Sequence, residues 1–160
     1  NISALTQECE ASKVVIVEAM SSLSAISEEN AASTEETSAS MQEVNSDVNL
    51  LARLIYGEAR GEPYTGQVAV GAVVLNRVKS SKFPNTIAGV IYQAGAFDVV
   101  ADGQINMTPN STAKKAAADA MNGWDPSYGS IYYFNPNTAT NDWIWSRPHT
   151  ITIGKHRFCK

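Results

Sequence analysis

The first 48 residues contain no glycine, no proline and no aromatic residue, and this constrains the fold of the chain more than any other feature. All 10 glycines, all 6 prolines and every Trp, Tyr and Phe lie beyond them. Residues that break helices and rings that fill cores are thus confined to one part of the sequence. This abrupt change in composition predicts two joined domains, residues 1–46 and residues 47–160.

Charge divides at the same place. Residues 1–48 hold one basic side chain, Lys13, and nine acidic ones, whereas the remainder holds eleven basic and seven acidic side chains. The net charges are therefore −8 and +4. A mildly cationic domain is attracted to an anionic polymer.

Targeting and redox signals are few. No apolar stretch approaches the roughly 20 residues of a membrane span, and no apolar leader opens the chain. The chain begins without methionine, and we expect its targeting signal to be missing from this sequence. Cys9 and Cys159 lie near opposite ends, so we expect two free thiols.

Residues 1–46 carry a heptad pattern typical of a coiled coil. Its a and d positions are Ile2, Leu5, Cys9, Ile16, Ala19, Leu23, Ile26 and Val44. The same frame places Asn30, Ser33, Thr37 and Ser40 in the middle of the seam. We therefore expect a long coiled-coil-type helix whose central part needs partner helices to stay ordered.

The segment "SDVNLLARLIYGEARGEPY" contains the candidate catalytic acid. Ser46 and Asp47 are candidate N-caps of a helix, and an apolar stripe along it continues at Glu58. A carboxyl on an apolar face is desolvated, which raises its pKa. Glu62 precedes a proline, so we expect the helix to end at about Gly61 and Glu62 to be a loop or cap carboxylate.

A second helix is predicted over residues 64–79, apolar on nearly every side and central in the core. Asn76 lies within it and has two interpretations: a core amide bonded to the backbone, or a side chain that orients Glu58 or a substrate amide. Asn85 is the expected cap of a short helix, and Asp102–Gly103 is a hairpin turn signal.

A third helix is predicted over "TAKKAAADAMN", capped by Asn110 or Ser111 and ended by Gly123. The segments "SIYYF", "DWIWS" and "HTITIGKHRFC" follow, and the last indicates a hairpin turned at Gly154. Helices first and strands later predict an α+β domain with a small sheet beside a helical core.

Aromatic residues are dense towards the end of the chain and alternate with amides. They are Trp124, Tyr128, Tyr132, Tyr133, Phe134, Trp143 and Trp145, with Asn135, Asn137, Asn141 and Arg147 among them. Aromatic platforms beside amide and guanidinium groups suit a glycan, although core packing explains any single ring equally well.

Other functional classes find little support. His149, His156 and Cys159 match no zinc-ligand spacing, and no G-x-S-x-G nucleophile elbow occurs. The positive charges form no basic run, which argues against nucleic-acid binding. We expect no metal and no cofactor.

Four motifs together resemble the catalytic domain of spore cortex-lytic enzymes, the SleB-type cell wall hydrolases. They are "LLARLIYGEARGEPYTGQVAVGAVVLNRV", "FPNTIAGVIYQAGAF", "GQIN" and "WIWSRP…IGKHRFCK", and the similarity runs from about Asp47 to Lys160. It implies a lysozyme-like, lytic-transglycosylase-related fold that acts on peptidoglycan of the spore cortex, which contains muramic-δ-lactam. It also implies a location outside the inner membrane and a dedicated stabilising or inhibitory partner protein.

Site residues follow from this resemblance and from the aromatic groove. The glutamate of "GEARGEP" is the family's catalytic acid and matches Glu58. The family's "QPGAF" loop appears here as "QAGAF", without its proline. The expected substrate-binding residues are Gln93, Phe97, Tyr132, Tyr133, Asn135, Trp143 and Trp145, with Glu62, Asn76 and Arg147 in support.

The mechanism has two candidate forms. A lone glutamate with a raised pKa fits a lytic transglycosylase, which forms 1,6-anhydromuramic ends between N-acetylmuramic acid and N-acetylglucosamine. A hydrolytic muramidase instead needs a second carboxylate about 5–9 Å away, for which Glu62, Asp98, Asp102 and Asp142 are the candidates.

Residues 1–45 resemble the methylation helix of bacterial chemotaxis receptors, on the segments "EENAAS" and "EETSAS". By this resemblance, Glu29 and Glu36 match the modified positions. The receptor's signalling tip, partner helix and membrane spans are absent, so we expect a helical leader or fusion partner. Self-association through this helix, as a non-enzymatic interaction module, is the alternative function.

Overall fold

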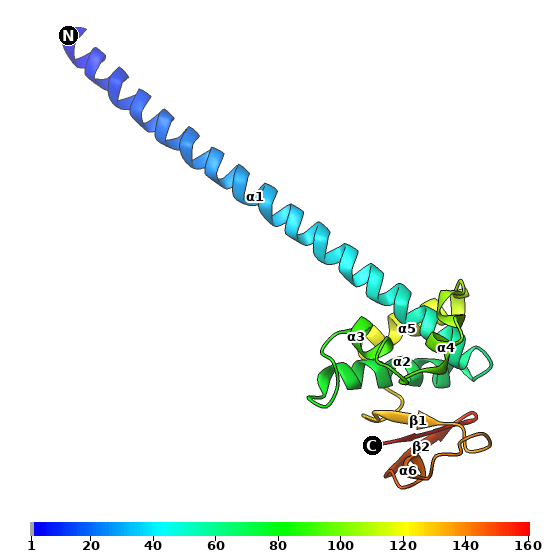
Figure 1. Ribbon diagram of the computed structural model, residues 1–160. Coiled ribbons are helices and arrows are strands. Elements are labelled where there is room, and N and C mark those ends of the chain that lie inside the picture. The colour runs from blue at the N-terminus through cyan, green and yellow to red at the C-terminus, as the bar shows by residue number, and fades with distance from the viewer. Residues whose placement is uncertain (1) are drawn as a thin grey trace. The chain divides into compact units, whose positions relative to one another are not determined.

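The structure is a computed structural model that describes residues 2–160, and it divides into two compact units, up to Glu43 and from Val44 onwards. Its helices are α1 (Ile2–Ala59), α2 (Tyr64–Lys79), α3 (Ile87–Ile91), α4 (Asp98–Ala101), the 3₁₀ turn η1 (Gln104–Asn106), α5 (Ser111–Met121) and α6 (Asp142–Trp145). Its strands are β1 (Tyr132–Phe134), β2 (His149–Ile153) and β3 (His156–Cys159) (Figure 1).

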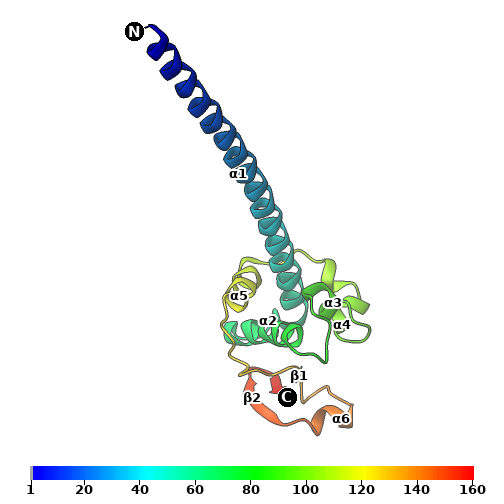
Figure 2. The same ribbon diagram turned by 90° about the vertical axis from the view of Figure 1, so that its left-hand side faces the viewer.

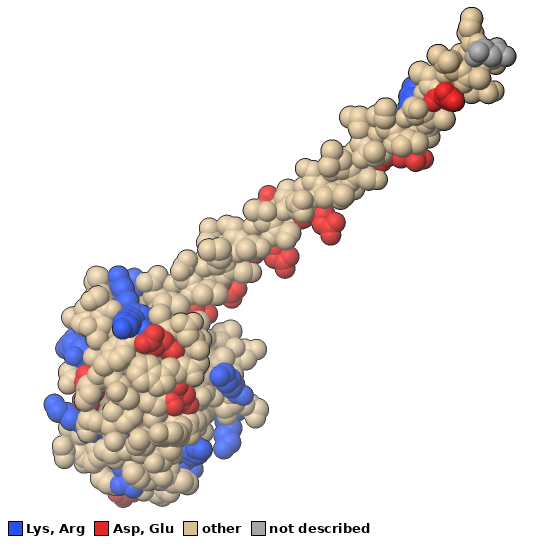
Figure 3. All heavy atoms as spheres, turned by 180° about the vertical axis from the view of Figure 1, so that it is seen from behind, with Lys and Arg blue, Asp and Glu red and all other residues tan. Residues whose placement is uncertain are grey.

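The first unit is entirely helical, as the absence of helix breakers predicts. Every residue from 2 to 46 is exposed, and acidic side chains are spread along the unit (Figure 3). The expected N-caps Ser46 and Asp47 are wrong, because α1 passes through both positions without a break. No glycine or proline interrupts the backbone hydrogen bonds there, so the two residues lie inside the helix instead of starting one.

The second unit has a helical core around α2, which spans the residues predicted for it. Its buried side chains run from Val68 to Val74 and meet Leu51, Leu54 and Ile55 of α1. Gly71 allows this packing, because a Cβ there would lie 3.0 Å from Ile55 Cδ1 and 3.2 Å from Ala120 Cβ of α5. The prediction that this helix is central in the core is confirmed.

A three-stranded antiparallel sheet with the order β1-β3-β2 lies beside the helices, and both ribbon views show it on one side of α2 (Figure 2). Tyr133 pairs with Phe158, and Ile153 pairs with His156 across a turn at Gly154. Gly154 has a φ of 59°, which favours glycine. The predicted α+β class, with a small antiparallel sheet and a long N-terminal helix, is confirmed.

The predicted signals hold at the ends of α5 but not at the start of α3. Asn110 caps α5 by accepting the Ala113 N–H at 2.8 Å, and Gly123 follows the helix with a φ of 99°. The expected cap Asn85 of the short helix is wrong by one residue. Thr86 is the cap, and its Oγ1 accepts the Gly89 N–H at 3.1 Å.

Two segments form helix where the sequence indicates β-structure. Asp102–Gly103 is not a hairpin turn, because the Asp102 carboxylate accepts the Gln104 N–H at 2.9 Å and joins α4 to η1. "DWIWS" forms α6, since Asn141 Oδ1 accepts the Trp143 N–H at 2.9 Å and caps a helical turn. In both places a hydrogen bond between a side chain and the nearby backbone outweighs the strand preference of short apolar and aromatic runs.

Both cysteines are free, as expected, with Cys9 exposed and Cys159 buried. Across residues 2–160, no helix combines the length and the apolar character that crossing a membrane requires.

We predict that deleting residues 1–43 leaves the second unit folded, because no residue before Val48 contributes to its core. The deletion should leave the melting temperature unchanged in differential scanning calorimetry. A fall of more than about 4 °C, equivalent to about 1 kcal/mol in a domain of this size, would show that the core depends on the first unit.

Candidate active site

Glu58 lies in the last turn of α1, where the buried stripe of Leu51, Leu54 and Ile55 continues towards the end of the helix. The side chain is half-buried. Helical spacing of three and four residues places it on the same face as that stripe. The prediction that Glu58 is carried towards the core is therefore confirmed.

Two hydrogen bonds hold the Glu58 carboxyl from different elements. The Tyr133 hydroxyl of β1 donates to Oε2 at 2.9 Å. The Val99 N–H, in the first turn of α4, points to Oε1 at 3.5 Å and makes the weaker contact. One carboxyl thus connects α1 to the sheet and to α4.

Gly57 makes the approach of α4 to Glu58 possible. A Cβ at this position would lie 2.7 Å from Val99 Cγ1 and 3.0 Å from Val99 Cβ. Real Cβ atoms do not come that close to a buried side chain, so α4 approaches this turn of α1 only because residue 57 has no side chain.

Burial raises the pKa of Glu58 above its ordinary value of 4.5. The hydrogen bonds from Tyr133 and Val99 lower the pKa, and the nearby charges of Asp98 and Asp102 raise it. Desolvation is the largest of these effects and sets the direction. The pKa of Tyr133 is raised well above 10 by its own burial, so its hydroxyl keeps its proton and donates it.

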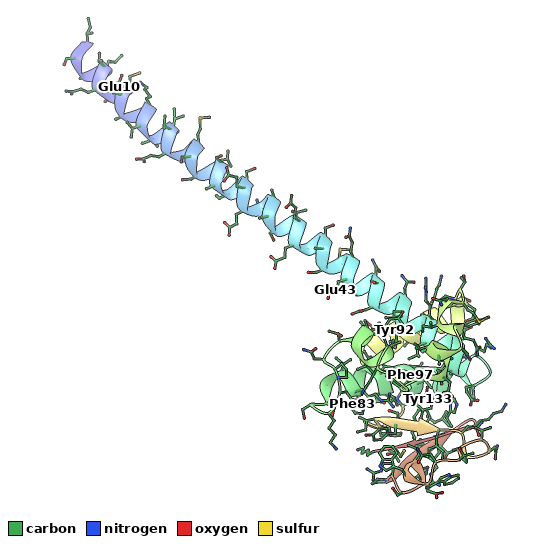
Figure 4. The ribbon with its side chains drawn as sticks, viewed as in Figure 1. Glu10, Glu43, Phe83, Tyr92, Phe97 and Tyr133 are labelled. Carbon is green, nitrogen blue, oxygen red and sulfur yellow. The ribbon has the colours of Figure 1, made fainter. Side chains whose placement is uncertain are left out.

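A cleft of about 600 Å³ opens beside Glu58, between the helices and the sheet. Phe97 and Tyr133 lie at this boundary, with Phe83 further along it (Figure 4). The cleft is lined by Glu58, Arg77, Ala96, Phe97, Asp98, Tyr133, Phe134, Asn135, Thr138, Ala139, Thr140, Asn141 and His156. An acid, a cation, amides and aromatic rings therefore face one space, as a glycan site requires.

Of the predicted substrate-binding residues, Phe97, Tyr133 and Asn135 line this cleft. The other four lie outside its lining. Gln93 is exposed in the turn before α4. Tyr132 and Trp143 pack edge to face at 5.1 Å, and Trp145 packs against Phe134 at 4.9 Å.

The three residues named in support have other contacts. Asn76 donates to Asp125 Oδ2 at 2.9 Å and to the Ser130 carbonyl at 3.1 Å, so it is a structural amide and does not orient Glu58. Arg147 lies over the Trp143 ring at 4.7 Å.

Glu62 holds the hairpin turn. Its Oε2 accepts the Lys155 N–H at 2.8 Å, and a Cβ on Gly154 would overlap the same oxygen. The prediction of a loop carboxylate is confirmed, and Glu62 is not among the residues that line the cleft.

His156 is a cleft residue to which the sequence assigned no role, since its spacing matches no zinc site. Its ring lies 5.0 Å from the Tyr133 ring, and burial lowers its pKa, so the imidazole is neutral at neutral pH. No cluster of three or more potential metal ligands occurs in the described part of the chain.

Arg77 and Asp98 also line the cleft. The sequence assigned no role to Arg77, and it named Asp98 only as one of four candidates for a second carboxylate. The signal for Arg77 is visible in "VLNRV", because a charged residue interrupts the buried face of an apolar helix. Asp98 follows directly after Phe97, but nothing in the sequence shows that the turn before α4 brings it to the cleft.

Comparisons with known proteins show the family of this chain. A family model described as Cell Wall Hydrolase matches residues 61–159. A spore cortex-lytic enzyme of Bacillus cereus is 64% identical over 114 residues, which are 71% of this chain and 44% of that protein. The cell wall hydrolase CwlJ of Bacillus subtilis is 31% identical over 71% of this chain and 84% of its own length.

A solved structure shows the same fold. It is the catalytic domain of the germination-specific lytic transglycosylase SleB from Bacillus anthracis, with a TM-score of 0.69 and 63% identity over 71% of this chain and 93% of that chain. The chain spans less than half the length of the cortex-lytic enzymes that it matches, 44% of the one from Bacillus cereus and 38% of the one from Bacillus subtilis.

We predict that Gly57→Ala destabilises the fold and lowers activity, because the new Cβ displaces Val99 and with it the N–H that faces Glu58. Overpacking costs about 1–3 kcal/mol, and alanine recovers about 1 kcal/mol of helix propensity. We therefore expect a net loss of about 1 kcal/mol in urea unfolding.

Gly61→Ala is the matched control, since nothing lies within 4 Å of a Cβ there. Unchanged stability and activity in Gly57→Ala would show that α4 does not need its close approach to α1.

Proposed function

Since the chain belongs to the Cell Wall Hydrolase family, we propose that it cleaves the glycan strand of peptidoglycan with Glu58 as the catalytic acid. The observation that carries this proposal is a glutamate of raised pKa that opens into a cleft with aromatic and amide walls. A raised pKa increases the fraction of a carboxyl that is protonated at a given pH, and a general acid must carry its proton.

The proposed bond lies between N-acetylmuramic acid and N-acetylglucosamine, and the reaction is that of a lytic transglycosylase. Glu58 gives its proton to the glycosidic oxygen as the bond from that oxygen to muramic C1 breaks. The resulting carboxylate takes the proton of the muramic C6 hydroxyl while this oxygen bonds to C1. A 1,6-anhydro ring closes, Glu58 regains its proton, and no water is consumed.

Hydrolysis by a muramidase is the alternative, and it needs a second carboxylate beside Glu58. Glu62 is engaged with the hairpin turn and lies outside the cleft lining. Asp98 is the other carboxylate that lines the cleft. Its charge adds to the rise in the Glu58 pKa, so the two carboxyls are close enough to interact. A second carboxylate in that role would activate a water molecule.

The proposed substrate is spore cortex peptidoglycan, with muramic-δ-lactam among its sugars, and the proposed setting is germination, outside the inner membrane. Support comes from the names of the relatives, a spore cortex-lytic enzyme and a germination-specific lytic transglycosylase. A dedicated stabilising or inhibitory partner protein stays a prediction of the family resemblance.

Residues 47–160 are proposed as the catalytic domain and residues 1–46 as a separate helical segment. The family match begins at residue 61, so the likeness of residues 1–45 to a receptor methylation helix, with Glu29 and Glu36 as modified positions, stays a prediction. Self-association through this helix has one supporting observation, its exposed apolar side chains such as Leu5, Leu23 and Ile26.

We predict that Glu58→Gln lowers cleavage of purified cortex peptidoglycan by about 10²–10⁴-fold, because the amide cannot transfer a proton. Muramic acid released into soluble fragments per minute gives the rate, and circular dichroism checks the fold.

Asp98→Asn is the matched control within the same cleft. It should keep most of the activity if Glu58 works alone, and a comparable loss would favour hydrolysis with Asp98 as the second carboxylate. Full activity of Glu58→Gln would end the assignment of Glu58.

We also predict that Tyr133→Phe moves the basic limb of the pH–rate profile to higher pH. The reaction needs protonated Glu58, so the rate falls as pH rises through its pKa. The Tyr133 hydroxyl lowers that pKa by bonding the carboxylate, and its removal raises the pKa further. Tyr132→Phe is the control, since Tyr132 neighbours it in β1 but lies outside the cleft lining. A shift to lower pH in Tyr133→Phe would contradict the assignment.

A further inference from the structure

Arg77 is a buried cation without an anionic partner. Its side chain is 8% exposed, and no carboxylate within residues 2–160 forms an ion pair with it. A charge taken out of water costs several kcal/mol unless a partner compensates for it. Burial accordingly lowers the pKa of Arg77, while nearby Tyr133, Tyr132 and Glu58 raise it. Glu58 has the smallest of these influences, and within the described residues it forms no ion pair with the guanidinium.

The structure holds Arg77 in one orientation. Its Nε donates to the Ile131 carbonyl at 2.7 Å, and its guanidinium carbon lies 5.0 Å from the Phe97 ring centre, 5.2 Å from that of Phe83 and 5.6 Å from that of Tyr132. The faces of aromatic rings attract a cation, but they do not accept directed N–H···O hydrogen bonds as the oxygens of a carboxylate do.

The terminal nitrogens of Arg77 are therefore available to a ligand. Arginine has five N–H donors, and Nε carries only one of them. The Ile131 bond is the only hydrogen bond of the Arg77 side chain within the described residues. Arg77 also lines the cleft together with Glu58 and Tyr133. An oriented fork of N–H groups thus borders the space where the glycan would lie.

We propose that Arg77 binds a carboxylate carried on the lactyl group of a muramic acid residue, an inference that rests on the proposed function. The planar guanidinium matches a carboxylate with two parallel N–H···O bonds. Muramic acid differs from N-acetylglucosamine by this lactyl ether alone. Arg77 would therefore distinguish the two alternating sugars and set which one lies beside Glu58.

Two sources supply such a carboxylate. In an N-acetylmuramic acid residue without a peptide, the lactyl group itself ends in a free carboxylate, whereas in muramic-δ-lactam this carboxyl is an internal amide and supplies none. In a glycan with stem peptides, that carboxyl is an amide, and the nearest carboxylates belong to the peptide. The shared chemistry is an anion attached through the lactyl group.

The test measures binding by isothermal titration calorimetry in Glu58→Gln, in which we expect cleavage of the ligand to be too slow to disturb the titration. The probes are a peptide-free tetrasaccharide of alternating N-acetylglucosamine and N-acetylmuramic acid, the same tetrasaccharide with stem peptides, and chitotetraose, which has no lactyl group. We expect a carboxylate-bearing probe to bind about tenfold more tightly than chitotetraose, because a hydrogen bond to a charged group contributes about that much to affinity. Preference for the first or the second probe identifies the source.

Adding Arg77→Gln should abolish that difference and leave the affinity for chitotetraose unchanged. Arg77→Lys should keep part of it, because the charge remains without the fork. Arg53→Gln, an exposed arginine of α1, controls for the change in net charge.

Several outcomes would overturn the inference. Equal affinity of Glu58→Gln for all three probes would refute the inference. This result needs no substitution at Arg77, so the inference can be tested even if the Arg77 variants do not fold. An equal loss of affinity for every probe in Arg77→Gln would show a purely structural role. Failure of any glycan to bind while Arg77 is intact would refute the proposed function itself.

Discussion

The hydrogen bond from Tyr133 to Glu58 is the interaction on which the site depends. It joins the last turn of α1 to β1 at 2.9 Å, across the boundary where the cleft opens. The bond fixes the acid, while the surrounding burial keeps its pKa raised. The two effects oppose each other, since the hydrogen bond favours the charged form and desolvation disfavours it. A carboxyl under two opposing influences of this kind suits the proposed mechanism, in which Glu58 acts first as an acid and then as a base.

Close approaches of backbone and side chain hold this arrangement in place. Gly57 admits Val99 to the turn of α1 that carries Glu58. On the other side, Gly154 admits the carboxylate of Glu62, which accepts the Lys155 N–H and ties the hairpin of β2 and β3 to the end of α1. The first contact joins α1 to α4, and the second joins the end of α1 to the sheet. Glu62, suggested by the sequence as a second catalytic carboxylate, serves this structural purpose.

Local signals in the sequence predicted the helices well. The apolar run from Val68 to Leu75 gave α2, and the cap at Asn110 with Gly123 gave α5. The apolar stripe through Leu51 and Ile55 predicted that Glu58 lies on the side of the helix that faces the core. The predictions of β-structure were wrong at Asp102 and Asn141. Each of these side chains accepts a hydrogen bond from a backbone N–H two residues later, which favours a helical turn in a short apolar run.

Long-range placement was beyond local patterns. Tyr133 reaches Glu58 across 75 positions of sequence, and Asp98 joins the cleft through the turn that precedes α4. The density of aromatic residues predicted a glycan surface. Phe134 lines the cleft, whereas Trp143 and Trp145 lie outside its lining, where Trp143 packs on Tyr132 and Trp145 packs on Phe134. Composition shows which residue types are present, whereas the sheet register decides which of them face the acid.

The central claim is that Glu58 alone carries out both proton transfers, so that no water enters the product. Mass spectrometry of the soluble fragments released from purified spore cortex peptidoglycan tests it most directly. Fragments that end in 1,6-anhydromuramic acid are the predicted result. Fragments with reducing ends, heavier by one water, would contradict the account and assign the second step to water activated by another carboxylate.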